Sequence, residues 1–269
     1  MPENRFDHRE EDELKYLRER VLKREVLAGT WLNLGSNVTA EIAGRAGFDW
    51  LLVDLEHGSG DEACLMGQLQ AISATDAAAI VRIPWNEAPR VKRTLDLGPS
   101  GIMVPYVNTA EEARRAVAAM RYPPEGVRGA ARFTRAAGFS MDFDRYFAEA
   151  NANLLTVVQI ETPQAVEQVE EIAAIEGVDV LFVGPLDLSV GLGIPGQNTH
   201  PDFRAALKRV SEAARQAGKA AGILLASADQ IAPTVADGFT FVAVGSDGGM
   251  VAAGMKSLRS AFQTVQNGF

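Results

Sequence analysis

The alternation of short apolar segments with helical patterns constrains the fold of this chain more than any other feature. Segments that are apolar along their whole length are typical of strands buried on both faces, as in a parallel sheet covered by helices. The expected strands cover residues 29–34, 50–55, 78–83, 101–105, 154–161, 178–184, 220–225 and 241–245. The expected helices cover residues 38–46, 61–73, 87–96, 109–120, 163–173, 202–217 and 228–237, with a last one from about 249.

Eight such strand–helix units in a chain of 269 residues predict an α/β fold of the (β/α)₈ barrel type. An open, doubly wound sheet is the alternative. No G-x-G-x-x-G motif follows the first expected strand, and its absence from that position favours the barrel.

The domain organisation follows from the same pattern. No low-complexity linker divides the chain, so we expect one barrel domain over residues 14–269, preceded by a polar, flexible tail over residues 1–13. Apolar residues recur at helical spacing from Leu14 to Leu22 and predict an amphipathic N-terminal helix. Residues 122–140 are rich in proline, glycine and arginine, and they predict a long ordered loop of a kind that is often functional.

The composition excludes several classes of protein. The net charge of −9 and the lack of a basic run argue against a nucleic-acid partner. No apolar run reaches the roughly 18 residues of a membrane span. The single cysteine, Cys64, excludes an internal disulfide and suits a reducing compartment. The charged N-terminus does not resemble a signal peptide, so we expect a cytoplasmic protein.

Polar residues follow several of the expected strands, at the end where barrel enzymes carry their active sites. A lone carboxylate at a strand end commonly caps the next helix or pairs with an arginine. Several charged groups directed to one barrel mouth are harder to explain in this way, because charged groups are rarely buried unless they are paired or bind a metal. These residues are Asp54, Glu56, His57, Arg82, Gln159, Glu161 and Asp187.

Glu161 and Asp187 follow successive strands. Two carboxylates at adjacent strand ends can hold one hard divalent cation, with water or substrate oxygens completing its coordination. A zinc site made of histidine and cysteine is not expected, because Cys64 lies in a helical pattern, His8 in the tail and His200 in a loop.

The lysines argue against imine chemistry. A Schiff-base lysine must be desolvated inside the pocket, and no lysine follows an expected strand. They are Lys15, Lys23, Lys92, Lys208, Lys219 and Lys256.

Several motifs in unbroken order resemble the HpcH/HpaI family of metal-dependent pyruvate aldolases, over roughly residues 14 to 260. The most specific are "QIET" followed one strand later by "GPLDLS", with "DLEHG" upstream. The others include "GTWLNLGS", "VRIPWNE", "RYPPEGVRG" and "FVAVGSDGGM".

The resemblance implies a (β/α)₈ barrel of the phosphoenolpyruvate/pyruvate type, whose last helix is exchanged between the subunits of a homo-oligomer, a hexamer in our expectation. It implies reversible aldol cleavage of a 4-hydroxy-2-oxo acid into pyruvate and an aldehyde, through a metal-bound enolate. Glu161 and Asp187 would ligate Mg²⁺, Mn²⁺ or Co²⁺.

The resemblance also assigns the remaining site residues. Arg82 would bind the keto oxygen, and His57, oriented by Asp54, would transfer a proton. The expected substrate-binding residues are Arg82, Gln159, Gly184, Pro185, Leu186, Asp187, Trp31 and Leu224, with backbone N–H groups around Leu186 and Asp187 holding the pyruvate carboxylate.

This sequence departs from the family pattern at two places that could reshape the aldehyde pocket: Leu55 stands where sugar-acid aldolases carry glycine, and "RGAARFTRAAGFS" replaces a glycine- or serine-rich stretch. The sequence leaves two other functions as alternatives. One is a lyase for citryl- or malyl-CoA esters, which would use a similar metal site. The other is a non-catalytic barrel that binds a small acid.

Overall fold

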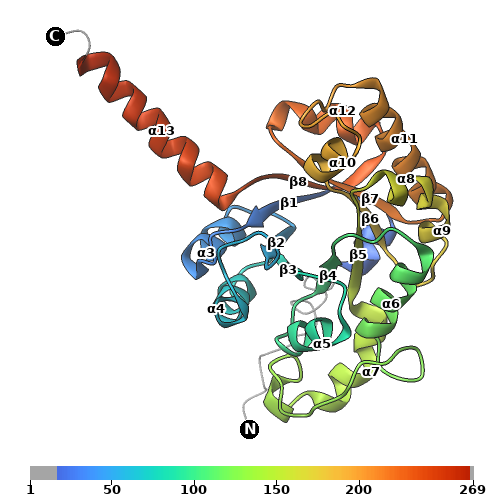
Figure 1. The fold of residues 1–269 in the computed structure, drawn as a ribbon. Helices are drawn as coiled ribbons and strands as arrows, with labels where there is room; N and C mark the ends of the chain where they lie inside the picture. The colour runs from blue at the N-terminus through green and yellow to red at the C-terminus, as the bar shows by residue number, and fades with distance from the viewer. Residues whose placement is uncertain (1–16, 267–269) are drawn as a thin grey trace.

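The computed structural model describes residues 17–266, and within them eight parallel strands close into a barrel in the order β1 to β8 (Figure 1). The prediction of a (β/α)₈ barrel is therefore confirmed. The strands are β1 (Leu27–Leu32), β2 (Trp50–Asp54), β3 (Ala78–Arg82), β4 (Gly101–Val104), β5 (Leu155–Ile160), β6 (Val180–Val183), β7 (Ala220–Leu225) and β8 (Phe239–Ser246).

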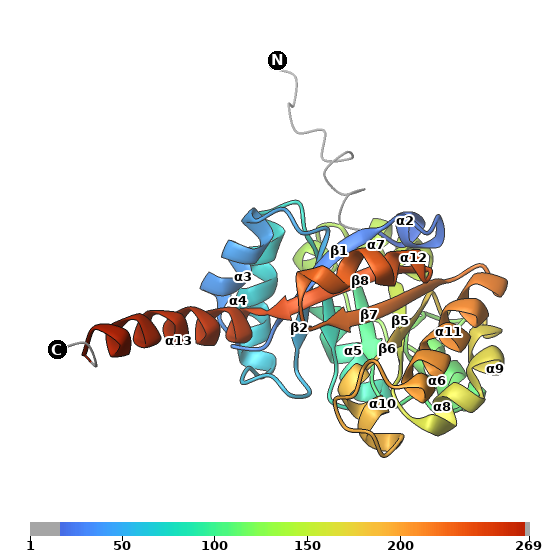
Figure 2. The same ribbon diagram turned by 90° about the horizontal axis from the view of Figure 1, so that it is seen from above.

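Most of the helices lie around the barrel and connect its strands, whereas α2 precedes β1 and α13 follows β8 (Figures 1 and 2). They are α2 (Arg18–Leu22), α3 (Asn37–Arg45), α4 (Glu62–Ser73), α5 (Ala88–Asp96), α6 (Ala110–Met120), α7 (Phe143–Asn153), α8 (Pro163–Glu167), α9 (Val169–Ala173), α10 (Pro185–Gly191), α11 (Pro201–Gln216), α12 (Ile231–Ala236) and α13 (Asp247–Gln266). Two 3₁₀ turns, η1 (Gly138–Ser140) and η2 (Ala228–Gln230), complete the set in this part of the chain.

The helices differ from the sequence-based expectation at three places. The expected helix over 163–173 is divided at Gln168, whose backbone leaves the helical region (φ −105°, ψ 13°). Helices α7 and α10 were not expected. α10 has only seven residues, too few for an apolar periodicity to be read, and it begins at Pro185, whose fixed φ suits a first helical turn. Residues 122–140 form turns and η1, as expected of a loop.

Aromatic side chains fill the barrel interior. Trp50 stacks on Phe241 with ring centroids 3.9 Å apart, and Phe182 meets Trp50 edge-on at 6.3 Å. Gly29 makes room for this packing, because a Cβ there would lie 2.2 Å from the Trp50 ring. The barrel is thus a packed core, and the polar residues lie beyond it at the strand ends.

The opposite, N-terminal end of the barrel is covered by the start of the described chain. Leu17 and Val21 are almost fully buried, which agrees with one face of the expected N-terminal helix, whereas Leu22 is 38% exposed. The expected tail over residues 1–13 and Leu14 lie outside the described residues.

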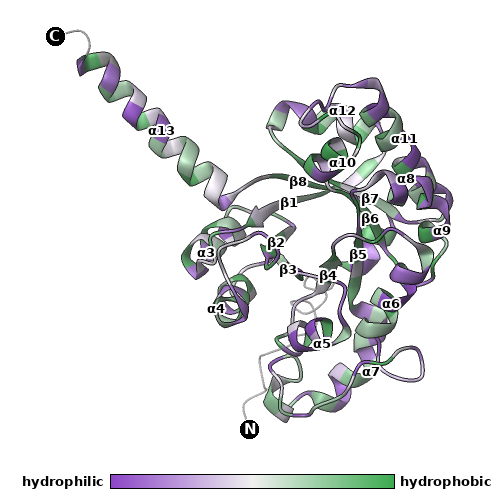
Figure 3. Ribbon diagram, in the orientation of Figure 1, coloured by the Kyte–Doolittle hydropathy of each residue, from purple (hydrophilic) through white to green (hydrophobic). Residues whose placement is uncertain are grey.

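Helix α13 extends away from the barrel (Figures 1 and 2). Its apolar residues, interspersed with polar ones, are between 42% and 70% exposed (Figure 3). These residues are Met250, Val251, Met255, Leu258, Phe262 and Val265. In residues 17–266 no helix is long and apolar enough to cross a membrane.

Candidate active site

The parallel register places Asp54 beside Arg82 at the carboxyl ends of β2 and β3. Both side chains are buried, and the guanidinium donates from Nε to Asp54 Oδ1 (2.9 Å) and from Nη2 to Asp54 Oδ2 (2.8 Å). Arg82 Nη1 lies 2.8 Å from Glu56 Oε2, and the guanidinium carbon lies 4.3 Å from the Trp31 ring centroid. The carboxylates of Asp54 and Glu56 and the ring of Trp31 therefore fix the orientation of the Arg82 guanidinium.

A second group forms around Glu161, which directly follows β5 and is 1% exposed. Gln159 Nε2 donates to Glu161 Oε2 (2.8 Å), and the backbone N–H of Tyr106 donates to Glu161 Oε1 (2.8 Å). Gly184 is required beside it, because a Cβ there would lie 2.5 Å from Glu161 Oε2. Arg82 Nη1 lies 3.5 Å from Gln159 Oε1, so the two groups adjoin.

Asp187 lies in the first turn of α10, beyond the end of β6, and is partly exposed. The Tyr106 hydroxyl lies 3.4 Å from its Oδ1. Burial, followed by the charges of Asp187 and Glu161, raises the pKa of the Tyr106 phenol, so this group remains a hydrogen-bond donor. The structure thus brings both expected metal ligands to one tyrosine.

The charges at the mouth of the barrel are unbalanced. Asp54 and Glu56 lie against the guanidinium of Arg82, which also acts on Glu161, and Asp187 adds a fourth negative charge that acts on Glu56 and Glu161. Burial, opposed by the Tyr106 N–H bond and reinforced by Glu56 and Asp187, raises the pKa of Glu161 to about 7. Burial also raises the pKa of Glu56, although Arg82 opposes this shift.

A divalent cation fits this set of groups. It would stabilise the ionised form of Glu161, which burial disfavours, and carboxylate oxygens are the ligands that hard cations prefer. Among residues 17–266, no three or more Asp, Glu, His or Cys side chains are grouped as a complete metal site. Water or substrate oxygens would therefore have to complete the coordination of an ion held by Glu161 and Asp187.

His57 lies in the loop after β2, and its side chain is 64% exposed. The sequence led us to expect that Asp54 orients the imidazole, but in the described structure its carboxylate accepts the backbone N–H groups of Glu56 and His57 and the guanidinium of Arg82. The ring Nε2 lies 3.8 Å from Glu56 Oε1 instead. Asp54 positions the backbone of His57, and Glu56 is the acid beside its ring.

The remaining expected substrate-binding residues lie at the same end of the barrel and differ in how far they are buried. Trp31 is buried, and Leu224 is partly buried against the cluster to which Trp31 belongs. Gly184 is buried, Pro185 is partly buried, and Leu186 is 66% exposed in the first turn of α10.

Sequence reasoning missed Tyr106. Inspecting the residues after each strand would have found it, because "PYVNT" directly follows β4. Its hydrogen bonds to residues on two other strand–helix units leave no signal in the sequence.

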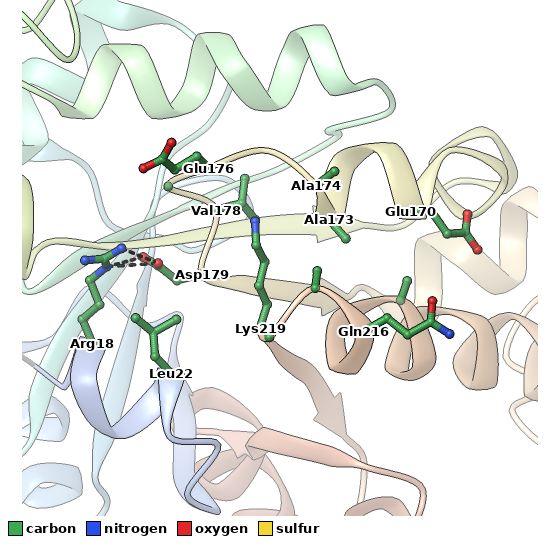
Figure 4. A pocket seen from close by; sticks show the side chains of 14 residues that line it. Arg18, Leu22, Glu170, Ala173, Ala174, Glu176, Val178, Asp179, Gln216 and Lys219 are labelled. Carbon is green, nitrogen blue, oxygen red and sulfur yellow. Dashed lines mark hydrogen bonds and ion pairs between the residues drawn. The ribbon is translucent and has the colours of Figure 1, made fainter.

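A cavity of about 540 Å³ lies at the opposite end of the barrel, and Figure 4 shows Lys219 and the paired Arg18 and Asp179 in its wall. Lys219 directly precedes β7, and its Nζ donates to the carbonyl oxygen of Ile175. Burial lowers the pKa of this amine to about 8. Because Lys219 precedes β7, it lies at the end of the barrel opposite the mouth.

The family model described as "HpcH/HpaI aldolase/citrate lyase" matches residues 27–253 of this chain. A 5-keto-4-deoxy-D-glucarate aldolase from Salmonella arizonae is 44% identical over 247 residues, which cover 89% of this chain and 93% of the relative.

An HpcH/HpaI aldolase/citrate lyase family protein from Burkholderia cenocepacia J2315 superposes with a TM-score of 0.87 at 39% identity, covering 94% of this chain and 99% of that one. The HpcH/HpaI aldolase from Desulfitobacterium hafniense DCB-2 has a TM-score of 0.84 at 30% identity, covering 93% and 96%. Aldolases make and break carbon–carbon bonds, so the expected class of enzyme, a carbon–carbon lyase, is confirmed. With the closed barrel and the "QIET" and "GPLDLS" motifs at its mouth, this chain belongs to the HpcH/HpaI aldolase/citrate lyase family.

Proposed function

We propose that this enzyme reversibly cleaves a 4-hydroxy-2-oxo acid into pyruvate and an aldehyde, using a divalent cation held by Glu161 and Asp187. The main support is the meeting of these two carboxylates with the buried guanidinium of Arg82 at one end of the barrel. Carboxylate oxygens suit Mg²⁺ and Mn²⁺, and Co²⁺ is the third candidate.

Cleavage breaks the bond between C3 and C4 of the substrate. The electron pair remains with the pyruvate fragment, and its charge spreads to the 2-oxo oxygen. The cation, when bound, supplies Lewis-acid stabilisation of this charge. Arg82 adds a second positive group in a buried position, where such an interaction is stronger than in water. Its two hydrogen bonds to Asp54 hold it in one orientation before substrate binds.

The C4 hydroxyl must lose its proton as C4 becomes an aldehyde, and C3 must gain one. We propose His57 for proton transfer, because its exposed imidazole lies at the mouth and an unperturbed histidine titrates near neutral pH. The carboxylate of Glu56 lies beside the imidazole, with Oε1 3.8 Å from the ring Nε2.

The rest of the site would bind the substrate. Backbone N–H groups at the start of α10, around Leu186 and Asp187, would bind the pyruvate carboxylate. Gln159 would hold Glu161 in place through the hydrogen bond that it donates. Trp31 and Leu224 would form apolar walls.

Release of pyruvate, measured by coupling to NADH oxidation, tests this function. The first substrate to assay is 5-keto-4-deoxy-D-glucarate, because the Salmonella relative is named for it. A panel of other 4-hydroxy-2-oxo acids and the esters malyl-CoA and citryl-CoA follows. We expect cleavage of at least one oxo acid, loss of this activity in EDTA and recovery with Mn²⁺.

Activity on a CoA ester alone would favour the lyase alternative, and no activity with any metal would favour a binding protein. The four carboxylates at the mouth, Asp54, Glu56, Glu161 and Asp187, outnumber the one guanidinium of Arg82, and this acidic charge argues against a polyanionic CoA substrate.

We further propose that α13 packs on a neighbouring subunit, in a hexamer. Its exposed apolar face, which includes Met255, Leu258 and Phe262, is of the kind that interfaces cover. Light scattering checks this: the parent should be an oligomer, and Leu258→Glu should dissociate it, whereas Gln263→Glu on the same helix should not. A monomeric parent at micromolar concentration would contradict the assembly.

A further inference from the structure

Tyr106 is the one described residue that forms hydrogen bonds with both proposed metal ligands. Its backbone N–H donates to Glu161 Oε1 at 2.8 Å, and its hydroxyl lies 3.4 Å from Asp187 Oδ1. Glu161 follows β5 and Asp187 lies in α10 after β6, whereas Tyr106 lies in the loop after β4. One residue from a third strand–helix unit therefore contacts both carboxylates.

The backbone of Tyr106 adopts an uncommon conformation. Its φ is 51°, in the left-handed region that residues other than glycine rarely occupy. This conformation directs the main-chain N–H toward Glu161 while the side chain reaches Asp187. Strained backbone of this kind persists where surrounding contacts hold it, and it gathers at functional sites.

Hydrogen bonds within and around the loop of Tyr106 hold its backbone in this conformation. Asn108 Nδ2 donates to the carbonyl oxygen of Tyr106 (3.2 Å), and the Asn108 N–H donates to Glu112 Oε2 (2.7 Å). The hydroxyl of Thr162, the residue after Glu161, donates to Asn108 Oδ1. The loop that carries Tyr106 is thus tied to the chain segment that carries Glu161.

Two carboxylates of the same charge keep a fixed distance from each other only if other contacts hold them in place. Without a cation they repel each other, and the burial of Glu161 reduces the screening of this repulsion by water. A donor to each carboxylate offsets part of this repulsion and limits the positions that the oxygens can take. Because both donors belong to one residue in one braced conformation, the two positions are coupled.

We propose that Tyr106 is a positioning residue that sets the spacing of Glu161 and Asp187 for a divalent cation, with its backbone N–H holding one carboxylate and its hydroxyl the other. This inference rests on the proposed metal site and adds to it a residue that does not itself touch the metal.

Direct Mn²⁺ binding to the metal-free enzyme, followed by the electron paramagnetic resonance signal of free Mn²⁺, tests the inference. Tyr106→Phe removes only the hydroxyl, and we expect the Kd for Mn²⁺ to rise about 3- to 10-fold, as the loss of one hydrogen bond implies. Asn108→Ala removes the bond to the Tyr106 carbonyl, and a rise at least as large is expected. The Mn²⁺ concentration for half-maximal activity should rise in parallel.

Tyr122→Phe is the matched control, because Tyr122 lies after α6, away from the mouth, and the change removes the same hydroxyl. Its Kd for Mn²⁺ should equal that of the parent. Parent-like Mn²⁺ binding by both Tyr106→Phe and Asn108→Ala would overturn the role of Tyr106 and leave the metal site intact. Failure of the parent to bind Mn²⁺ would instead overturn the proposed metal site, and the inference with it.

Discussion

Asp54 binds Arg82 through two parallel hydrogen bonds, of 2.9 Å and 2.8 Å, between side chains at the ends of adjacent strands. Both groups are buried, so each compensates the charge of the other. A carboxylate that accepts both bonds leaves the guanidinium little freedom to rotate. This pairing gives Arg82 a fixed direction at the site where we propose that negative charge develops.

Arg82→Lys should lower kcat/KM for oxo-acid cleavage by on the order of 10²–10³, the usual cost of losing a donor that stabilises developing charge. Lysine keeps the charge but cannot make two parallel bonds to Asp54. The matched control is Arg93→Lys, because Arg93 makes an exposed ion pair with Glu62 (2.9 Å). Parent-like kcat/KM in a folded Arg82→Lys variant would show that the bidentate geometry is unnecessary.

Glu161→Gln should abolish tight Mn²⁺ binding without destabilising the metal-free enzyme at pH 8. Burial raises the pKa of Glu161 to about 7, so the folded protein binds more protons than the unfolded chain between pH 4.5 and about 7. The contribution of Glu161 to the stability of the metal-free parent therefore falls as the pH rises through this range, and glutamine removes this contribution. Denaturant unfolding at several pH values, in EDTA, measures the effect.

The exposed Glu111 provides the control for that experiment, since Glu111→Gln should change neither Mn²⁺ affinity nor the pH dependence. Tight Mn²⁺ binding by Glu161→Gln would mean that the cation is held elsewhere.

His57→Ala should slow cleavage by on the order of 10²–10⁴, the range for loss of a general acid or base. Because the side chain is 64% exposed, the free energy of unfolding should change little. His200→Ala is an informative contrast: His200 accepts the N–H of Asp202 at the start of α11, so its loss should reduce stability and leave turnover unchanged. Rapid turnover by a well-folded His57→Ala enzyme would remove this residue from the mechanism.

Lys219 should influence stability at alkaline pH and take no part in catalysis. Burial lowers its pKa from 10.5 to about 8, so between these values the unfolded chain binds more protons than the folded one. The contribution of this group to stability should therefore rise as the pH increases from about 8 to 10.5. Lys219→Gln should lose this rise, whereas Lys208→Gln, at an exposed position, should keep it.

Borohydride in the presence of pyruvate checks the catalytic half of this prediction. The protein mass should not change, because no imine forms. A covalent adduct of pyruvate mass at any lysine would contradict a metal-assisted mechanism.

The local pattern of the sequence was sufficient to predict the barrel. Apolar runs at regular intervals and intervening helical periodicity depend on neighbouring residues alone, and each expected strand overlaps an observed one. The placement of Arg82, Gln159 and Glu161 at the strand ends could be predicted for the same reason. The short helix α10 could not, because seven residues carry too little periodicity.

What the amino-acid sequence determined by itself was therefore the class of fold, the family motifs and which polar residues reach the mouth of the barrel. Only the tertiary structure decided how they pair. Asp54 binds Arg82 and the His57 backbone because closed parallel strands set its neighbours by register, and Tyr106 reaches two carboxylates because a braced loop holds a left-handed backbone. The pKa of Glu161 likewise depends on burial by segments distant in the sequence, which no local pattern records.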